Sequence, residues 1–135
     1  MFDAMKISAS GLSAETVRID VVANNLANQD TAATPGGAPY QSEFVQLLSL
    51  PANRQGVGQG VEVGAIGSQP TPAIVVHNPT SPYANNQGNV LYANVSVATQ
   101  MVDLIQAESA YQANANAFTA VGGTYVKTFS LGAGP

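Results

Sequence analysis

Apolar residues recur every seven positions near both ends of the chain, and this spacing predicts two long helices. The first helix is expected over about residues 3–28 and the second over about residues 96–131. A seven-residue repeat makes a narrow apolar stripe, of the kind that packs helices together in coiled coils. Ten residues make up this stripe, which we call the seam: Met5, Leu12, Ile19, Leu26, Val97, Met101, Leu104, Tyr111, Phe118 and Tyr125.

On each helix we also predict companion positions, which lie four residues after the positions of the seven-residue repeat. These companions include Ala9, Thr16, Ala23, Met101 and Glu108. The pair Gly122-Gly123 interrupts the second helix, where each glycine costs about 1 kcal/mol relative to alanine. We therefore expect bending, fraying or a close contact with a neighbouring helix at this pair.

The middle of the chain is rich in residues that break helices. It contains seven of the eight prolines and eight of the thirteen glycines. Residues 40–50 and 60–66 are predicted strands, joined by a loop at 51–59, and residues 73–77 are a third short candidate. In the second strand, Val61, Val63 and Ala65 alternate with Glu62 and Gly64, the pattern of a half-buried strand. Residues 31–39 and 78–89 are predicted loops. The expected fold is mainly α with a small β part. Its long N- and C-terminal helices pair as a coiled-coil-like hairpin, with a short β-hairpin and Pro/Gly-rich loops between them.

Composition narrows the class of protein. Charged residues make up only 9% of the chain, against about 25% in ordinary soluble proteins, so we expect other protein to cover much of its surface. A net charge of −4 excludes a basic surface for nucleic acid. No apolar run reaches the roughly 20 residues that membrane insertion requires. The absence of cysteine excludes disulfides and thiolate metal sites.

The residues that could carry catalysis do not form a recognisable site. His77 is the only histidine, so a histidine-based metal site lacks its second imidazole. The glycines at 56–60 lack the lysine and the strand–helix context of a phosphate loop. Asp103 and Glu108 are five residues apart and therefore do not share a helix face. We predict no enzymatic activity, no cofactor and no metal. A small hydrolase using His77 and a soluble binding module with paired helices remain alternatives.

Short sequence motifs near both ends of the chain, which we call boxes, resemble those of the axial proteins of the bacterial flagellum. Residues 24–28, Asn-Asn-Leu-Ala-Asn, followed by a threonine, resemble the family's first box. Residues 107–114 and 127–132 resemble its C-terminal ending, Ala-x-x-x-Tyr-Gln-Ala-Asn followed by Lys-Thr-Leu-x-Leu-Gly. The box residues are Asn25, Leu26, Asn28, Thr31, Tyr111, Gln112, Asn114, Lys127, Thr128, Leu131 and Gly132.

The length and the middle of the chain narrow the resemblance to proximal rod subunits. Residues 76–90, together with Asn94 and Val95, are similar to the corresponding stretch of C-type proximal rod proteins. B-type proximal rod subunits share both end boxes and are the alternative. The resemblance implies a discontinuous helical core domain for axial assembly, residues 1–30 plus 95–135, and an extended loop and β-hairpin region, residues 31–94.

The resemblance also implies a structural role in the flagellar basal body. Proximal rod subunits polymerise helically into the shaft that crosses the periplasm and transmits motor torque for swimming. The implied partners are copies of the chain itself, B-type and distal rod proteins, the hook–basal body adaptor at the rod base, and the flagellar type III export apparatus. We expect export without a cleaved signal peptide. We also expect an isolated chain that is poorly ordered at both ends and folds on assembly.

Overall fold

The computed structural model describes residues 2–132, which form two long helices and four strands. In chain order these are α1 (Phe2–Ala27), β1 (Ser42–Ser49), β2 (Val61–Gln69), β3 (Ile74–His77), β4 (Asn89–Tyr92) and α2 (Val97–Gly132). The prediction of a mainly α fold with a small β part is confirmed. Positions 1 and 133–135 of the predicted core domain lie outside the described residues.

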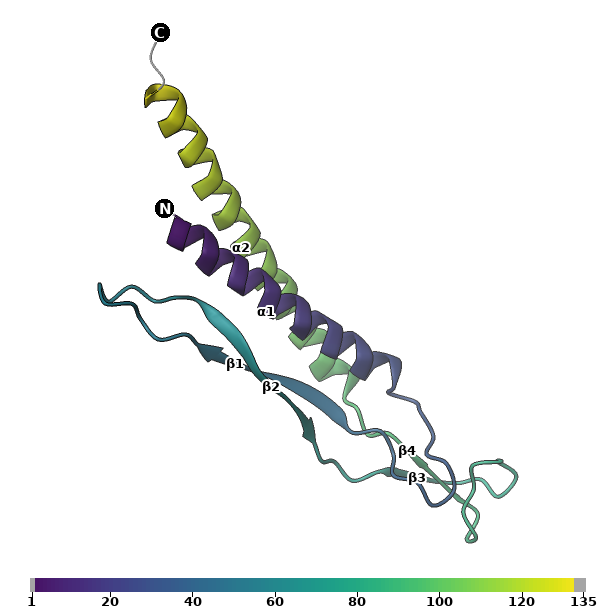
Figure 1. Cartoon of the computed structure of the whole chain (residues 1–135). Coiled ribbons are helices and arrows are strands. Elements are labelled where there is room, and N and C mark those ends of the chain that lie inside the picture. The colour runs from purple at the N-terminus through teal and green to yellow at the C-terminus, as the bar shows by residue number, and fades with distance from the viewer. Residues whose placement is uncertain (1, 133–135) are drawn as a thin grey trace.

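The two helices lie side by side and run in opposite directions (Figure 1). Three pairs of residues mark their register: Phe2 with Tyr125, Gly11 with Asn114, and Asn25 with Gln100. The first pair places two aromatic rings with their centroids 5.6 Å apart. The third is a hydrogen bond of 2.8 Å between side chains. Helices from opposite ends of the sequence therefore form one elongated layer.

The companion positions of the seam differ from the prediction. Ala9, Thr16 and Ala23 are exposed, whereas the residues before them are buried: Ser8, Glu15 and Val22. In α2, Gln100 and Ala107 are buried in place of Met101 and Glu108. The companions thus follow the seam residues by three positions, which is the a-to-d spacing of paired helices. Polar and small side chains occupy much of this contact, so hydrophobicity alone did not locate it.

An antiparallel hairpin, β1–β2, lies along α1 (Figure 1). Its pairing runs from Ser42 opposite Gln69 to Ser49 opposite Val61. A bulge at Gly64 interrupts the ladder, because Gln46 pairs with Ala65 whereas Leu47 pairs with Val63. This extra residue shifts the alternation expected over 61–65. Val61 and Val63 are half-buried and Ala65 is exposed.

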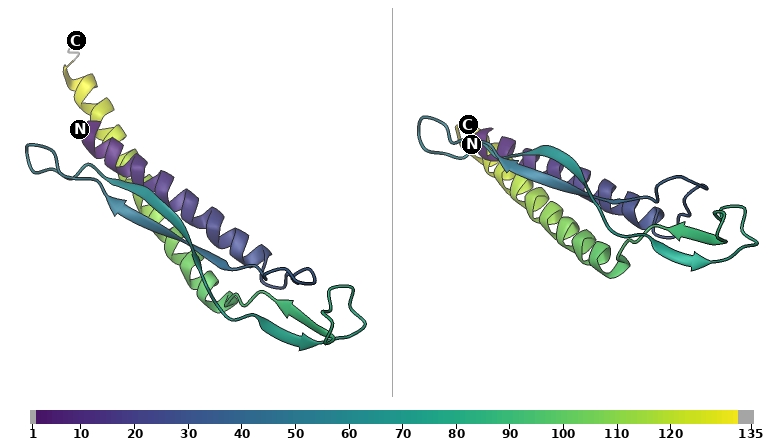
Figure 2. Two further views of the ribbon diagram at one scale, coloured as in Figure 1. Left: turned by 60° about the horizontal axis from the view of Figure 1, so that its bottom comes forward. Right: turned by 90° about the horizontal axis from the view of Figure 1, so that it is seen from below.

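A second ribbon, β3–β4, lies at the end of the molecule away from both termini (Figure 2). Strand β3 agrees with the expected strand at 73–77, but β4 was not predicted. Backbone hydrogen bonds also join residues 31–33 to the other edge of β4, through Ala33 N–H to Leu91 O and Ala93 N–H to Thr31 O. Pairing on both edges therefore stabilises this four-residue strand.

The Gly122-Gly123 pair does not interrupt α2, which continues to Gly132. A Cβ atom added to either glycine would meet no atom within 4 Å. Of the alternatives expected at this pair, a close contact with a neighbouring helix is absent among residues 2–132. Neither described helix has an apolar stretch long enough to cross a membrane.

Candidate functional site

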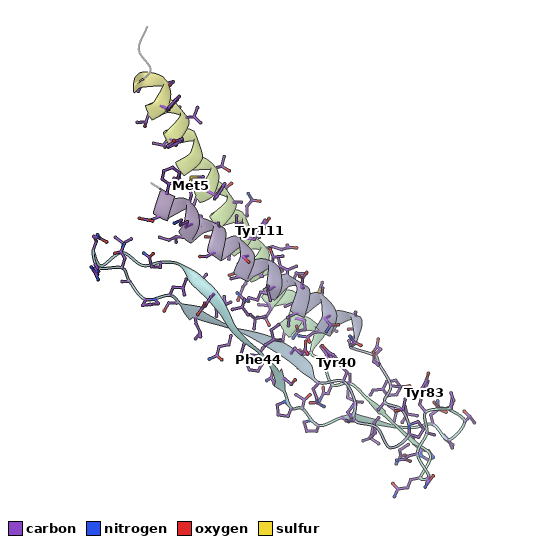
Figure 3. All side chains as sticks on the ribbon, in the orientation of Figure 1. Met5, Tyr40, Phe44, Tyr83 and Tyr111 are labelled. Carbon is purple, nitrogen blue, oxygen red and sulfur yellow. The ribbon has the colours of Figure 1, made fainter. Side chains whose placement is uncertain are left out.

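The seam runs along both helices, and on α1 it lies on the side turned away from the β1–β2 hairpin. On α1 the hairpin contacts Ser10, whose Oγ accepts a hydrogen bond of 3.1 Å from Val61 N–H. Leu12 follows Ser10 by two residues, which is about 200° around a helix. Figure 3 shows two seam residues, Met5 and Tyr111, on the helix pair and Phe44 on the hairpin beside it.

The seam residues differ in exposure within the single chain. Six are half-buried: Met5, Leu12, Ile19, Leu26, Leu104 and Phe118. Four are exposed: Val97, Met101, Tyr111 and Tyr125. One chain therefore covers only part of its own apolar stripe.

Asn25 joins three parts of the fold near the C-terminal end of α1. Its side chain is fully buried. The amide nitrogen donates to Gln100 Oε1 in α2 and to the backbone oxygen of Glu43 in β1, each at 2.8 Å. The amide oxygen accepts from Glu43 N–H at 2.8 Å and from the Tyr40 hydroxyl at 2.7 Å. All four hydrogen-bonding positions of the amide are thus used.

The environment of Tyr40 favours its neutral form. Burial raises the pKa of the hydroxyl above its ordinary value of 10.0, and the nearby Glu43 carboxylate raises it further. The hydroxyl also accepts a hydrogen bond of 3.2 Å from the Asn24 side chain. Neither Tyr40 nor Gln100 was identified from the sequence, since each is an isolated polar residue whose partners are distant along the chain.

The remaining residues of the first box end α1. Asn28 Nδ2 donates to the Asn24 backbone oxygen at 2.9 Å, and the Thr31 hydroxyl donates to Asn28 Oδ1 at 3.2 Å. Leu26, the seam member of this box, is half-buried. These bonds satisfy polar groups where the helix ends, because the last carbonyls of a helix lack intrahelical partners.

The C-terminal box residues divide between two places. Three of them, Tyr111, Gln112 and Asn114, lie in the middle of α2. Asn114 contacts α1 at Gly11 and donates to the Ala110 backbone oxygen at 3.0 Å. The other four lie at the exposed end of α2: Lys127, Thr128, Leu131 and Gly132. Asn94 and Val95 precede α2, and Asn94 Nδ2 donates to the Pro72 backbone oxygen at 3.0 Å.

The candidate chemical residues are dispersed. His77 is exposed at the end of β3, with Nδ1 3.0 Å from Asn89 Oδ1. Among residues 2–132, no cluster of three or more carboxylates or histidines could hold a metal ion. The arrangement that the structure brings together is an elongated, partly uncovered helix pair fixed to a hairpin.

Two family models of known proteins match segments near the two ends of the chain. The family model described as "Flagella basal body rod protein" matches residues 5–32, and "Flagellar basal body rod FlgEFG protein C-terminal" matches residues 86–125. The flagellar basal-body rod protein FlgC of Bacillus subtilis is 36% identical, covering 97% of both chains. FlgC of Yersinia enterocolitica is 35% identical and that of Salmonella typhimurium 34%, each covering 98% of both chains.

These relatives favour the C-type over the B-type interpretation and describe a structural protein rather than an enzyme. The first box and residues 107–114 lie within the segments matched by the two family models, whereas residues 127–132 lie beyond the second matched segment. With identities above 30% over nearly the whole length, the chain belongs to the FlgC family, the structural rod proteins of the flagellar basal body.

Proposed function

We propose that this chain polymerises helically as a subunit of the proximal rod, which crosses the periplasm and transmits motor torque to the hook and filament. The observation that carries this proposal is the partly uncovered seam. Four of its ten residues are exposed in the single chain, although apolar side chains gain about 1.5–3 kcal/mol each on burial. Packing against further subunits would supply that burial.

The proposed assembly uses the two regions differently. Residues 1–30 and 95–135 form the helical core domain, in which the seam packs as a coiled-coil-like hairpin against neighbouring subunits. Residues 31–94 form an extended region of loops and hairpin, joined to the core through Asn25. The helix ends far from Asn25 become fully ordered only in the assembled rod, because one chain buries little apolar surface there.

The proposed partners follow from membership of the rod family. They are copies of this chain, B-type proximal and distal rod proteins, the adaptor at the rod base, and the flagellar type III export apparatus that delivers the subunit. A helical shaft needs contacts between two different surfaces of the subunit, because such contacts do not close into a ring of fixed size.

Deleting the gene and restoring it from a plasmid tests the proposal. We expect the deletion strain to lose swimming and to retain membrane rings without a rod in electron micrographs of purified basal bodies. The plasmid should restore both. Complete rods in the deletion strain would contradict a rod function and favour the soluble binding module.

A further inference from the structure

The closed end of the β1–β2 hairpin is a preformed turn. We call residues 53–57 the tip. The Asn53 N–H donates to Val57 O at 2.8 Å, and the Asn53 backbone oxygen accepts from Gly56 N–H at 2.9 Å. The Asn53 Oδ1 accepts from the N–H groups of Gln55 and Val57 at 3.0 and 2.9 Å. Gly56 has a positive φ of 77°, which glycine adopts without strain. The backbone of the tip is therefore held in one shape before it meets any partner.

The tip carries an exposed cation, Arg54. It lies beyond the strands, at the end of the hairpin nearest to both termini (Figure 2). Within residues 2–132 the single ion pair joins Arg18 and Glu15, so Arg54 has no anionic partner in the described chain. An arginine combines a long apolar stem with a forked cation. A surface that covers Arg54 must therefore offer both apolar side chains and carboxylates.

A cleft with this chemistry lies at the opposite end of the hairpin, between α1, β1 and α2. Its volume is about 180 Å³. Val21, Val22 and Val45 supply apolar lining, and all three are buried or half-buried. Glu43 and Asp103 line the same cleft, and neither takes part in the ion pair of the described chain. The cleft thus offers two carboxylates beside an apolar wall.

The cleft is negatively charged overall. Arg18 also lines it, but its guanidinium is already bonded to Glu15 at 3.4 Å. One positive and three negative side chains therefore gather here, since Glu43 and Asp103 add to this pair. A further cation would gain both from this charge and from the apolar wall.

One copy cannot fill its own cleft. Ser49 follows Glu43 by six residues, which is about 20 Å along a strand, and the tip lies further on. A second copy must supply the cation. Among its exposed cations, Lys6 and Lys127 carry single ammonium groups, whereas the fork of Arg54 can bond two carboxylates at once.

We propose that Arg54 of one copy fills the cleft of a second copy, with its stem against the valines and its guanidinium beside Glu43 and Asp103. This inference rests on the proposed rod function and specifies one of its subunit contacts. The two copies have the same orientation and are displaced along the hairpin. Each added copy then presents a free tip or a free cleft to the next, as an open shaft requires. A single side chain buries little area beside the ten residues of the seam, so we expect rods to remain complete without it.

Cysteine labelling measures whether the cleft is filled, because the chain contains no cysteine of its own. A chain carrying Val45→Cys is expressed in the deletion strain, and a maleimide is applied to the isolated chain and to purified basal bodies. We expect labelling to be several-fold slower in basal bodies, and adding Arg54→Ala should restore most of the lost rate. Arg54 is exposed, so circular dichroism of this variant should match that of its parent.

The matched control for labelling is Gln46→Cys. Gln46 is exposed and follows Val45, so its side chain lies on the other face of β1. Its labelling rate in basal bodies should not respond to Arg54→Ala.

Carbodiimide coupling identifies both ends of the contact. Arg54→Lys keeps the positive charge and places an amine at the tip. The reagent joins an amine to a carboxylate, with loss of water, where the two lie in contact. We expect dimers, trimers and longer species in basal bodies, with position 54 linked to position 43 or 103 by mass spectrometry. The parent chain is the control, because a guanidinium does not couple, and should lack these links.

Four outcomes would overturn the contact or the function separately. An unchanged labelling rate at position 45 after Arg54→Ala, with complete rods, would overturn the contact and leave the rod function standing. Links from Lys6 or Lys127 to the same carboxylates would assign the cleft to a helix instead of the tip. Dimers alone at complete coupling would mean that two reversed copies exchange tips, which closes the pair. Complete rods in the deletion strain would overturn the rod function itself.

Discussion

At the scale of single residues, the fully buried Asn25 organises the fold more than any apolar side chain. A buried amide is costly unless all of its hydrogen bonds are made, and here all four are made to α2, β1 and Tyr40. These bonds join both helices and β1 in the observed register. Asn25 of the first box therefore stabilises the single chain, independently of the rod's other subunits.

Replacing Asn25 by aspartate should destabilise the chain by about 3 kcal/mol at pH 7. The carboxylate would face the Glu43 and Gln100 oxygens that now accept hydrogen bonds, and neither would retain its donor. Urea denaturation followed by circular dichroism measures the loss. Asn116→Asp is the control, because Asn116 is exposed and its Oδ1 only accepts a bond from Gln112. Equal stability of both variants would show that the network contributes nothing.

Tyr40 should make the stability of the chain fall above pH 10. Its pKa is raised in the folded chain, so the folded state retains a proton that the unfolded state releases. The stabilisation is therefore complete below the unfolded pKa of about 10 and is lost as the pH rises through the folded pKa. Tyr40→Phe should lower the free energy of unfolding by about 1 kcal/mol at pH 8. In urea denaturation, its free energy of unfolding should also decline less between pH 9 and 11 than that of the parent chain. An unchanged decline would mean that other groups cause it.

At the scale of elements, the repeat of apolar positions predicted the two helices, whereas the strand that depends on pairing with distant residues was not predicted. The helices and β1–β3 were predicted to within a few residues, the helices from their seven-residue apolar repeat and β2 from its alternation. Strand β4 depends on hydrogen bonds to β3 and to residues 31–33, which leave no local pattern. The companions of the seam were misplaced by one position because serine, glutamate and glutamine occupy buried helix positions there.

The helix–helix contact should tolerate a larger side chain at Gly122 but not at Gly11. A Cβ atom on Gly11 would lie 2.7 Å from the Asn114 side chain, whereas the space over Gly122 is open. Gly11→Leu should lower the free energy of unfolding by about 2 kcal/mol through forced separation of the helices. Gly122→Ala should raise it by about 0.5–1 kcal/mol through helix propensity. Thermal denaturation of both variants measures the difference, and a reversed order would contradict this packing.

At the scale of the whole molecule, the chain is elongated and its core is thin. The largest fully buried side chains among the described residues are only Val90 and Asn25. A single layer of two helices with one hairpin cannot enclose the apolar residues of its seam. The low charge of the sequence has the same physical meaning, since a surface that is covered by other subunits does not need solvation.

Placing a charge in the seam should therefore stop assembly while sparing the middle of the chain. Leu12 and Leu104 are half-buried seam residues, one on each helix. Aspartate at either would lose the 1.5–3 kcal/mol of an apolar side chain in every copy and bring an unpaired charge into the contact. Leu12→Asp and Leu104→Asp should give basal bodies with rings but no rod, whereas Gln55→Asp, in the exposed loop between β1 and β2, should give complete rods. Hydrogen exchange over residues 42–69 should match the parent chain in all three variants. Complete rods from either seam variant would mean that subunits contact each other through the hairpin region instead.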